Sequence, residues 1–355
     1  MTAPTTDSFM YQTMMSQPDA IRRIVTSGWE QAASAADLLR PARRVTITGI
    51  GTSYHAALVG SWLLRAAGCD ARAVSSFDFA TYPDIFPIQA EDAVIVMAHT
   101  GVKSYSKSAL DRAVAAGVTV VSVGSATAEH PGSALILRTV EREKSAAYTA
   151  SHLAAMTVLA QVAAALGEDH AEPQTSGFRQ VLNQLPDQIA AILERLDEVH
   201  PIAGYAIDHR VYAAGAGPNE ATALELVIKT REAAYGQVDA LAAEQFLHGP
   251  MVAVNKGDLA VMIDVPGASG VRVAEITSVL DGIGATLWVV GQPVAAAPHA
   301  TTFRIPVVPE MLSPLVAVVP MQMLAYQMAV LKQINPDTFR RDNEVYKDAF
   351  SRLTL

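Results

Sequence analysis

Apolar and polar positions follow two different spacings along the chain. Short runs of consecutive apolar, mostly β-branched residues are typical of strands that are buried on both faces. Longer stretches in which apolar residues recur at helical spacing separate these runs. In the first half we predict strands at 45–48, 93–97 and 119–123, and helices at 54–67, 106–116, 149–166 and 178–199. Buried strands that alternate with helices indicate a parallel sheet.

The same pattern restarts in the second half of the chain. Here we predict strands at 211–214, 259–263, 286–290 and 303–307, and helices at 219–235 and 314–332. We interpret the chain as a twofold repeat of one α/β unit, with a boundary near Asp197–Tyr205. The residues after Asp337 are polar and are predicted to form a C-terminal tail.

The composition agrees with a folded α/β protein of two domains. Half of the 355 residues are hydrophobic and 17% are charged, which is enough apolar side chain for a buried core. The net charge of −9 argues against a nucleic-acid partner, because phosphate-backbone affinity comes from clustered Lys and Arg. Apolar runs such as Ala93–Ala98 are too short to cross a membrane.

The N-terminus and the cysteine usage indicate a cytoplasmic protein. Residues 1–18 are polar and lack the apolar stretch of a signal peptide. The single cysteine, Cys69, can form neither an internal disulfide nor a thiolate metal site. No His, Asp or Glu cluster has the spacing of a metal site, so we expect no metal.

A glycine turn lies between the first predicted strand and the helix that follows it. It reads Gly49-Ile50-Gly51-Thr52-Ser53-Tyr54. Glycines permit a tight turn, a helix N-terminus attracts an anion, and Thr52 and Ser53 add hydroxyl donors. Taken alone, an ordinary strand–helix turn with a capping hydroxyl remains the favoured alternative. A dinucleotide-binding loop needs a third glycine where Tyr54 stands, and no Walker motif is present, so we expect no cofactor.

A second polar turn follows the strand predicted at 93–97. In this turn, which reads His99-Thr100-Gly101-Val102-Lys103-Ser104, hydroxyls and the Lys103 ammonium are suited to surround a phosphate. The alternative is a solvated loop whose lysine faces water. Two such turns at the carboxyl edge of one sheet support an anion site better than either alone, because ligands of open α/β sheets gather there.

Two motifs in the second half carry a resemblance to a known family. They are Leu224-Glu225-Leu226-Val227-Ile228-Lys229-Thr230-Arg231-Glu232 and Ala243-Glu244-Gln245-Phe246-Leu247-His248-Gly249-Pro250. They resemble the isomerase part of glucosamine-6-phosphate synthase (glutamine–fructose-6-phosphate aminotransferase), which is built from two sugar-isomerase (SIS) domains. The family reads roughly Ala-Leu-Glu-x-x-x-Lys-x-x-Glu and then Glu-x-x-His-Gly-Pro. Resemblances at 15–18, 51–54 and 320–326 extend the match from about residue 10 to residue 340.

The resemblance implies a fold and a division of the chain. It implies two flavodoxin-like SIS subdomains, each a five-stranded parallel sheet flanked by helices. We place them at 26–197 and 198–336, after an N-terminal arm at 1–25 and before a C-terminal tail at 337–355. The synthase also carries a glutaminase domain with a nucleophilic cysteine. Nothing in this sequence matches that domain, so we expect no release of ammonia from glutamine.

The resemblance also implies the catalytic groups. Glu232 would move a proton between C1 and C2 of the sugar, and His248 would open the sugar ring. In the family this histidine reaches the neighbouring subunit's active site, which implies a homodimer with a shared site. Without the resemblance, Glu232 would be an exposed charge paired with Lys229, and His248 a loop histidine bonded to a carbonyl. Lys229 would steady the carboxylate or the sugar hydroxyls, or form a surface ion pair with Glu225.

The sequence departs from the family at the substrate loops and in the tail. Ala98 and Lys103 stand where the synthase has a serine and a threonine. A synthase loop that reads Val-Ala-Ser-Thr-Lys best matches residues 146–150, where Thr149 keeps its hydroxyl and Ala150 replaces the lysine. The imine-forming lysine of the synthase tail matches Glu344, and Lys347 serves only if the tail is shifted. Synthase-type amine transfer is therefore not favoured.

The preferred interpretation is an enzyme of the phosphosugar aldose–ketose isomerase type. We expect it to act on an amino-sugar or fructosamine 6-phosphate, as a deaminase or deglycase does. The alternatives are a simple phosphosugar isomerase and a non-catalytic sugar-phosphate sensor. We expect Glu232 and His248 to be catalytic, and the substrate to be bound by Gly51, Thr52, Ser53, His99, Thr100, Lys103, Ser104, Lys229 and Lys347.

Overall fold

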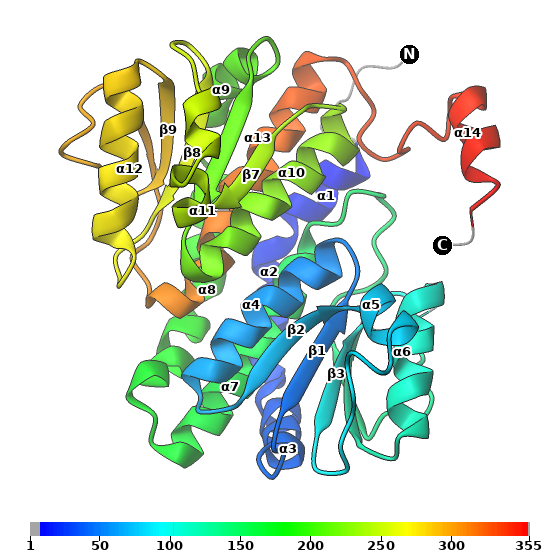
Figure 1. Ribbon diagram of the computed structural model, residues 1–355. Coiled ribbons are helices and arrows are strands. Elements are labelled where there is room, and N and C mark those ends of the chain that lie inside the picture. The colour runs from blue at the N-terminus through cyan, green and yellow to red at the C-terminus, as the bar shows by residue number, and fades with distance from the viewer. Residues whose placement is uncertain (1–7, 102, 354–355) are drawn as a thin grey trace. The chain divides into compact units, whose positions relative to one another are not determined.

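The computed structural model describes residues 8–101 and 103–353, which divide into two compact units (Figure 1). The first unit comprises residues 16–144, 148–186 and 340–353, and the second comprises residues 8–15, 145–147 and 187–339. Part of the predicted N-terminal arm, residues 8–15, thus belongs to the second unit. The predicted limits of the arm, the two domains and the tail differ from these units and stay a prediction.

The first unit is built on a five-stranded parallel sheet. Its strands run in the order β2 (Ala71–Ser75), β1 (Val45–Gly49), β3 (Ala93–Met97), β4 (Thr119–Gly124) and β5 (Leu135–Arg138). Val45 of β1 pairs with Ala71 of β2 on one side and with Ala93 of β3 on the other. Every residue of β3 is buried, as its unbroken apolar sequence predicts.

Helices cover the sheet of the first unit. They are α2 (Gln17–Ser27), α3 (Trp29–Leu39), α4 (Thr52–Ala66), α5 (Ser76–Thr81), α6 (Ser104–Ala115) and α7 (Ala150–His170). Helix α7 packs against α2, α3 and α4. The apolar side chains of α7 are distributed over all faces of the helix, which is typical of a helix inside a core.

The second unit repeats this architecture. Its parallel strands run in the order β10 (Thr301–Arg304), β9 (Thr286–Gly291), β8 (Leu259–Asp264), β6 (Val211–Gly215) and β7 (Asp239–Ala242). Its helices include α1 (Phe9–Met15), α9 (His200–Ala206), α10 (Glu220–Ala234), α11 (Ala243–Leu247), α12 (Gly270–Ile283) and α13 (Pro314–Leu331). Read from the other edge, the strand order is the same as in the first unit. The predicted twofold repeat, and two five-stranded parallel sheets flanked by helices, are therefore confirmed.

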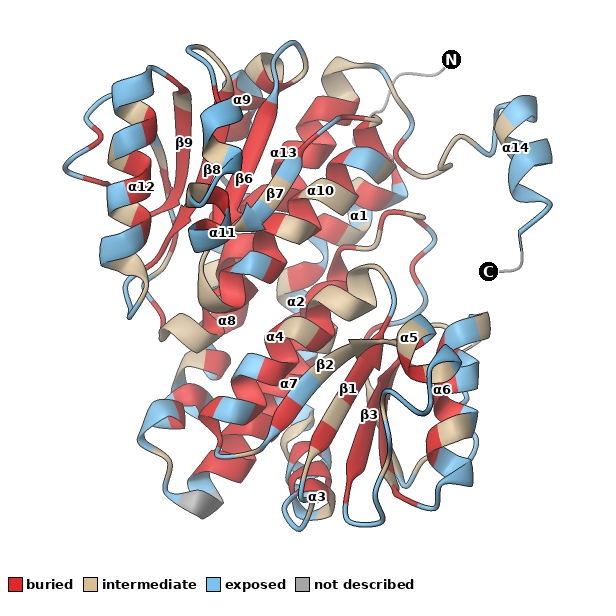
Figure 2. Cartoon of the chain, viewed as in Figure 1, coloured by how far each residue is buried: buried red, intermediate tan, exposed pale blue. Residues whose placement is uncertain are grey.

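Two helices are long and apolar enough to cross a membrane by length and composition. They span Ala150–Glu168 and Glu310–Leu331, and their windows are 94% and 89% buried inside the protein. Figure 2 shows both segments almost wholly in the colour of buried residues. Burial of this extent is typical of core helices in a folded protein.

The sequence prediction missed the least apolar elements. Strands β2, β5 and β7 are edge strands whose residues are partly exposed, so they lack a continuous apolar run. Helices α2, α3 and α12 were also missed. The predicted helix at 178–199 is confirmed up to Leu193 and wrong beyond it, because α8 (Phe178–Leu193) ends there and a 3₁₀ turn at Leu196–Val199 follows. The predicted strand at 303–307 is shifted, since β10 ends at Arg304.

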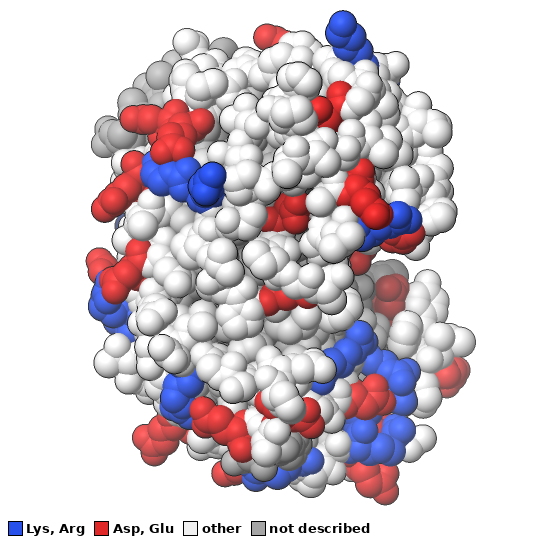
Figure 3. Space-filling model, turned by 90° about the vertical axis from the view of Figure 1, so that its left-hand side faces the viewer, with Lys and Arg blue, Asp and Glu red and all other residues white. Residues whose placement is uncertain are grey.

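The C-terminal segment contains a further helix, α14 (Glu344–Phe350), which begins with a side-chain cap from Asn343. None of its residues is buried (Figure 2). On the molecular face drawn in Figure 3, the basic and acidic side chains of the described residues lie interspersed and are not sorted by sign.

Candidate functional site

The first glycine turn connects β1 to α4 as the sequence predicts. Gly51 has φ 57°, a conformation that favours glycine. A Cβ on Gly49 would lie 2.5 Å from the carbonyl oxygen of Ser53, so this position also requires glycine. Thr52 and Ser53 are the first residues of α4, and the backbone N–H of Ser53 donates to the carbonyl oxygen of Ile50 at 3.1 Å. The turn thus presents the side-chain hydroxyls of Thr52 and Ser53 at the carboxyl edge of the sheet.

A pocket lies at this edge, within the first unit. Its described lining comprises Thr52, Ser53, Ala56, Met97, Ala98, His99, Val123, Gly124, Thr139, Tyr148, Ser151, His152 and Ala155. It therefore brings together three of the predicted substrate residues, Thr52, Ser53 and His99. The pocket is small, with a cavity volume of about 20 Å³, which is room for little more than one water molecule. None of its described lining side chains is a lysine, arginine, aspartate or glutamate.

His99 is held neutral in this pocket. Burial, with a smaller contribution from the Arg142 charge, lowers the pKa of His99 to about 4. Its ring meets that of Tyr148 edge to face, with centroids 5.2 Å apart. The Nε2 atom of His99 is buried without a hydrogen-bond partner in the described protein. A buried polar atom of this kind is suited to meet a ligand or a water molecule.

The other polar residues of the second turn lie outside the pocket lining. The side chain of Lys103 is exposed just before α6, and Ser104 is the first residue of that helix. The hydroxyl of Thr100 is buried without a hydrogen-bond partner in the described protein, but Thr100 does not line the pocket. Val102 lies outside the described residues. The roles of Thr100, Lys103 and Ser104 in phosphate binding stay predictions.

His130 fixes the backbone of this turn. Its Nε2 lies 2.9 Å from the carbonyl oxygen of Ala98, and because a carbonyl only accepts, the imidazole donates. The ring also packs against Gly101 and Gly124, where an added Cβ would meet its atoms at 3.3 Å and 2.6 Å. Burial lowers the pKa of His130, which favours this neutral donor form.

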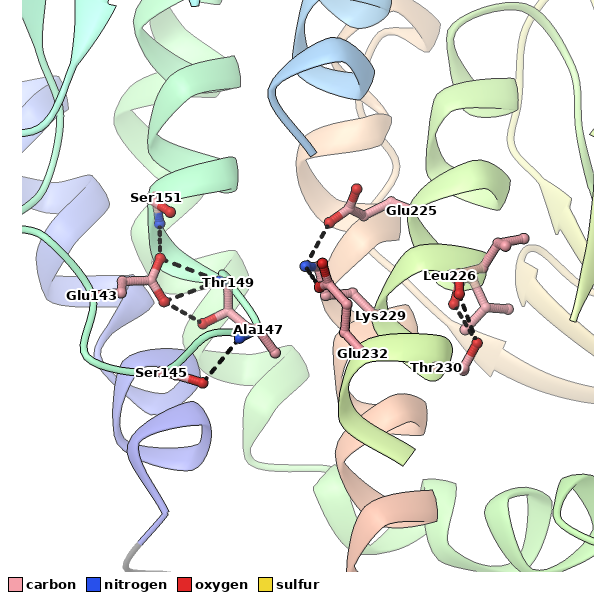
Figure 4. A network of polar contacts seen from close by, with 11 residues as sticks. Glu143, Ser145, Ala147, Thr149, Ser151, Glu225, Leu226, Lys229, Thr230 and Glu232 are labelled. Atoms are coloured by element: carbon pink, nitrogen blue, oxygen red, sulfur yellow. Dashed lines mark hydrogen bonds and ion pairs between the residues drawn. The ribbon is translucent and has the colours of Figure 1, made fainter. Parts of the chain in front are cut away.

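Glu143 organises the N-terminus of α7, on the pocket's other side. The carboxylate accepts hydrogen bonds from the backbone N–H groups of Thr149, at 3.1 Å and 3.2 Å, and of Ser151, at 2.6 Å (Figure 4). The Thr149 hydroxyl also donates to it at 3.4 Å. Thr149 is fully buried, so its hydroxyl stabilises the protein's own loop. From the sequence, this hydroxyl is notable only as one that the matching synthase loop also has.

The second unit contains the predicted acid. On α10, the ammonium Nζ of Lys229 lies 2.5 Å from Oε2 of Glu232 and 3.5 Å from Oε1 of Glu225 (Figure 4). Lys229 and Glu225 are fully buried, whereas the Glu232 side chain is 22% exposed. The alternative of an ion pair between Lys229 and Glu225 is therefore right about the partners and wrong about the location, because the pair is buried. Lys229 is a buried cation between two carboxylates, and only Glu232 reaches the surface.

His248 lies on the surface of the second unit, directly after α11. Its side chain is 68% exposed, and its Nε2 lies 2.9 Å from Oε1 of Glu244. Arg272 binds the same carboxylate at 2.7 Å and 3.0 Å. The hydrogen bonds from Arg272 and His248 lower the pKa of Glu244 to about 2. The imidazole is thus bonded to Glu244, neither to a carbonyl nor to Glu232.

Lys347 lies on α14 and is exposed. Its role in substrate binding stays a prediction. Among residues 8–101 and 103–353, no three His, Cys, Asp or Glu side chains are grouped as a metal site.

Comparison with known proteins now decides the family. The model of the SIS domain matches residues 38–165 and again residues 205–332. The chain belongs to the SIS domain family. Each match covers most of one of the two parallel sheets described above, so the SIS domain is present twice.

Individual relatives match most of the length of this SIS protein. Glutamine–fructose-6-phosphate aminotransferase (isomerizing) of Pyrococcus horikoshii is 30% identical over 337 residues, which are 93% of this chain and 56% of that protein. The chain thus spans about half the length of the curated relatives it matches.

Solved structures show the same fold. The C-terminal domain of glucosamine-fructose-6-phosphate aminotransferase from Francisella tularensis has a TM-score of 0.83 at 16% identity, over 92% of this chain and 96% of that one. Glucosamine-6-phosphate deaminase from Thermotoga maritima has a TM-score of 0.75 at 20% identity, over 93% and 97%.

The first SIS domain lines its pocket with residues that the sequence prediction did not select. They are Thr139, Tyr148, Ser151 and His152. Ser151 and His152 lie in the first turn of α7, immediately after the loop whose resemblance to the family was recognised. Their place at a helix N-terminus next to that loop was a usable signal. Thr139 follows an edge strand that was not predicted, and no signal in the sequence marked it as a site residue.

Proposed function

We propose that this SIS protein is an enzyme of the phosphosugar aldose–ketose isomerase type that acts on an amino-sugar or fructosamine 6-phosphate. The observation that carries the proposal is the ion cluster on α10. A partly exposed carboxylate, Glu232, is held by the buried ammonium of Lys229, whose charge Glu225 also compensates. A base that shuttles a proton must be fixed in place and still reach the substrate, and this cluster supplies both properties.

The proposed chemistry moves two protons and leaves the carbon skeleton intact. Glu232 takes the proton from the carbon next to the carbonyl or imine carbon, and protonation of the carbonyl oxygen or imine nitrogen gives an enediol or enolamine. Glu232 then returns the proton to the neighbouring carbon as the hydroxyl or amino group on the first carbon loses its proton, so the aldose and ketose forms interconvert. Lys229 is proposed to hold one carboxylate oxygen, so that the other is directed to the substrate.

Release of nitrogen follows from the same shuttle. For a 2-amino aldose phosphate, isomerisation places an imine at C2, and water adds there and expels ammonia. For a ketosamine phosphate, the shifted imine lies at C1, and water expels the attached amine. Each reaction consumes one water and needs neither oxidant nor reductant. The names of the relatives, an aminotransferase and a deaminase of amino-sugar phosphates, support the nitrogen-bearing substrate.

The first SIS domain is proposed to bind the phosphate. Its pocket lies at the carboxyl edge of the sheet, where the hydroxyl-bearing residues Thr139 and Ser151 line it. Thr52, Ser53 and the neutral His99 are proposed as further donors. Because the chain carries a net charge of −9, an anionic sugar needs such local donors.

His248 is proposed to open the sugar ring in a homodimer. Its exposure leaves the imidazole accessible to a second copy of the chain. An imidazole is suited to this step because it exchanges a proton near neutral pH.

The test is an assay that measures sugar interconversion and amine release in the same reaction. Purified protein is incubated with glucosamine 6-phosphate, with a fructosamine 6-phosphate and with fructose 6-phosphate. Sugar interconversion and free amine are measured in each reaction. We expect amine release that Glu232→Gln abolishes and that the matched control Glu220→Gln, on the same helix, preserves.

The alternatives give different results. Interconversion of sugars without amine release would mean a simple phosphosugar isomerase. A thermal shift with these sugars but no turnover of any would mean a sensor, and would overturn the enzymatic proposal. Turnover that survives Glu232→Gln would mean that Glu232 on α10 is not the catalytic base.

A further inference from the structure

The first unit contains a second, larger cavity. It lies between α2, α3, the edge strand β5 and α7, and its volume is about 380 Å³. This is within the usual size of small-molecule sites. The residues that matter below are Arg23, Ser27, Gly28, Arg138, Thr139 and Gln161, all of which line it.

Gln161 of α7 presents an unsatisfied acceptor in this cavity. The residue is 1% exposed, and its Nε2 donates to the carbonyl oxygen of Ile24 at 3.1 Å, which fixes the orientation of the amide. Its Oε1 has no hydrogen-bond partner in the described protein. A buried acceptor that lacks a partner destabilises a protein, so such atoms are rare unless a ligand or water meets them.

Gly28 leaves this oxygen open to the cavity. It lies between α2 and α3, and a Cβ at this position would come within 2.9 Å of Oε1 of Gln161. The same Cβ would come within 2.7 Å of the carbonyl oxygen of Ile24, so the local backbone also excludes a side chain at residue 28.

Two arginines and one carboxylate residue, the exposed Glu30, line the same cavity, so its charged residues sum to a net positive charge. Arg138 donates from Nη1 to the carbonyl oxygens of Ser125, at 3.1 Å, and Ala128, which anchors the guanidinium. Arg23 is exposed on α2. Neither arginine forms an ion pair with a carboxylate among the described residues. Arginine is the side chain best suited to grip a phosphate, because its planar fork of donors matches the phosphate oxygens.

We propose that this cavity is a second binding site, for a phosphorylated metabolite that also carries a hydroxyl or N–H donor. Arg23 and Arg138 bind the phosphate, and Oε1 of Gln161 accepts a hydrogen bond from the donor. The site is separate from the pocket proposed for the substrate of the isomerase-type reaction. It therefore does not depend on that function.

Thr139 connects the two sites. It lines both cavities, and its N–H and hydroxyl both donate to the carbonyl oxygen of Gly124, at 2.9 Å and 2.8 Å. Gly124 itself lines the substrate pocket. A ligand that moves Thr139 thus acts on the substrate pocket through one residue, and an effect of each ligand on the other's affinity is expected.

Calorimetric titration of the full chain tests the proposal. The Glu232→Gln variant is used, so that turnover does not disturb the measurement. The probes are inorganic phosphate, glucose 6-phosphate and adenosine 5′-monophosphate, so that the sugar and nucleotide sources of the same chemistry are distinguished. We expect one of the two organic phosphates to bind in the cavity, and inorganic phosphate to bind there at least about tenfold more weakly because it has no separate donor group for Gln161.

Variants assign this binding to the cavity. Arg23→Gln should weaken it at least about tenfold, whereas Arg22→Gln, the neighbouring exposed arginine that does not line the cavity, should leave it unchanged. Gln161→Leu should weaken the organic phosphate and leave inorganic phosphate unaffected. Thr52→Val, in the substrate pocket, should not remove this site.

The proposal is overturned by either of two results. One is that all phosphate binding is lost with Thr52→Val and none with Arg23→Gln. The other is that no probe binds while the circular dichroism spectrum of the variant is that of the wild type. Neither result bears on turnover, so failure of this proposal is distinguishable from failure of the proposed enzymatic function.

Discussion

The ammonium of Lys229 lies 2.5 Å from the carboxylate of Glu232, one turn further along the same helix. Lys229 is fully buried, and Glu232 is the member of the pair that reaches the surface. A lysine is rarely buried unless its charge is compensated. The relationship therefore couples the stability of α10 to the position of the proposed base.

Replacing Lys229 by methionine should destabilise the protein strongly. The substitution keeps the length of the side chain but leaves Glu225 fully buried without its cation, and such a loss typically costs about 3–5 kcal/mol. Urea unfolding of the two proteins measures the difference. Glu232→Gln is the control and should cost about 1 kcal/mol or less, because that side chain is partly solvated. Equal costs for the two variants would contradict the assigned burial.

The Glu143 carboxylate should stabilise the N-terminus of α7 and the pocket together. Glu143→Ala removes an acceptor from two backbone N–H groups and one hydroxyl, so we expect a loss of about 2–4 kcal/mol in the free energy of unfolding. The exposed Glu141→Ala is the matched control and should change it by less than about 0.5 kcal/mol. If Glu143 also holds the loop beside the substrate pocket in place, the KM of Glu143→Ala for the sugar phosphate should rise. A stability change with an unaltered KM would separate the loop from substrate binding.

The centre of each sheet was predictable from sequence, and its edges were not. Strands such as β3 and β8 are buried on both faces, so their apolar runs are unbroken. Edge strands such as β7, Asp239–Ala242, alternate between exposed and half-buried positions and resemble loops in sequence. The helix predicted at 178–199 ends at Leu193, and the helical spacing of its apolar residues does not indicate that end.

The candidate site was predictable where it depends on local sequence. Thr52 and Ser53 follow a glycine turn whose geometry the sequence determines, and the structure places both in the pocket. Thr139 comes from a segment far from that turn, and only the pairing of β5 with β4 brings it to the pocket. The burial of Lys229 was equally hidden, because a lysine and two glutamates on one helix are usually a solvated face.

The buried His99 should make stability depend on pH. Its pKa is about 4 in the folded protein and near 6.5 when unfolded, so the unfolded chain binds the extra proton more readily. The stabilising contribution is complete above pH 6.5 and is lost as the pH falls toward 4. Denaturant unfolding of wild type and His99→Gln between pH 4 and 7.5 measures it.

The difference between the two proteins is the informative quantity, because carboxylates titrate in the same range. His99→Gln should lose less stability than wild type between pH 6.5 and 4. Parallel curves for His99→Gln and wild type would mean that the imidazole is solvated in the folded protein.

The exposed His248 should matter for turnover and hardly for folding. Its only partner among the described contacts is the surface carboxylate of Glu244, so His248→Asn should change the free energy of unfolding by about 1 kcal/mol or less. Loss of a group that transfers a proton during ring opening should lower turnover by about 10²-fold or more. Unfolding and steady-state assays on one preparation test both expectations.

Mixing two inactive variants tests whether the site is shared between subunits. Glu232→Gln and His248→Asn chains are unfolded together, refolded at equal amounts and assayed. If each site takes its glutamate from one chain and its histidine from the other, half of the dimers are mixed, and each mixed dimer has one intact site. Turnover should then return to about one quarter of the wild-type value. If both residues of a site came from the same chain, every site in the mixture would carry a substitution, and no activity would return.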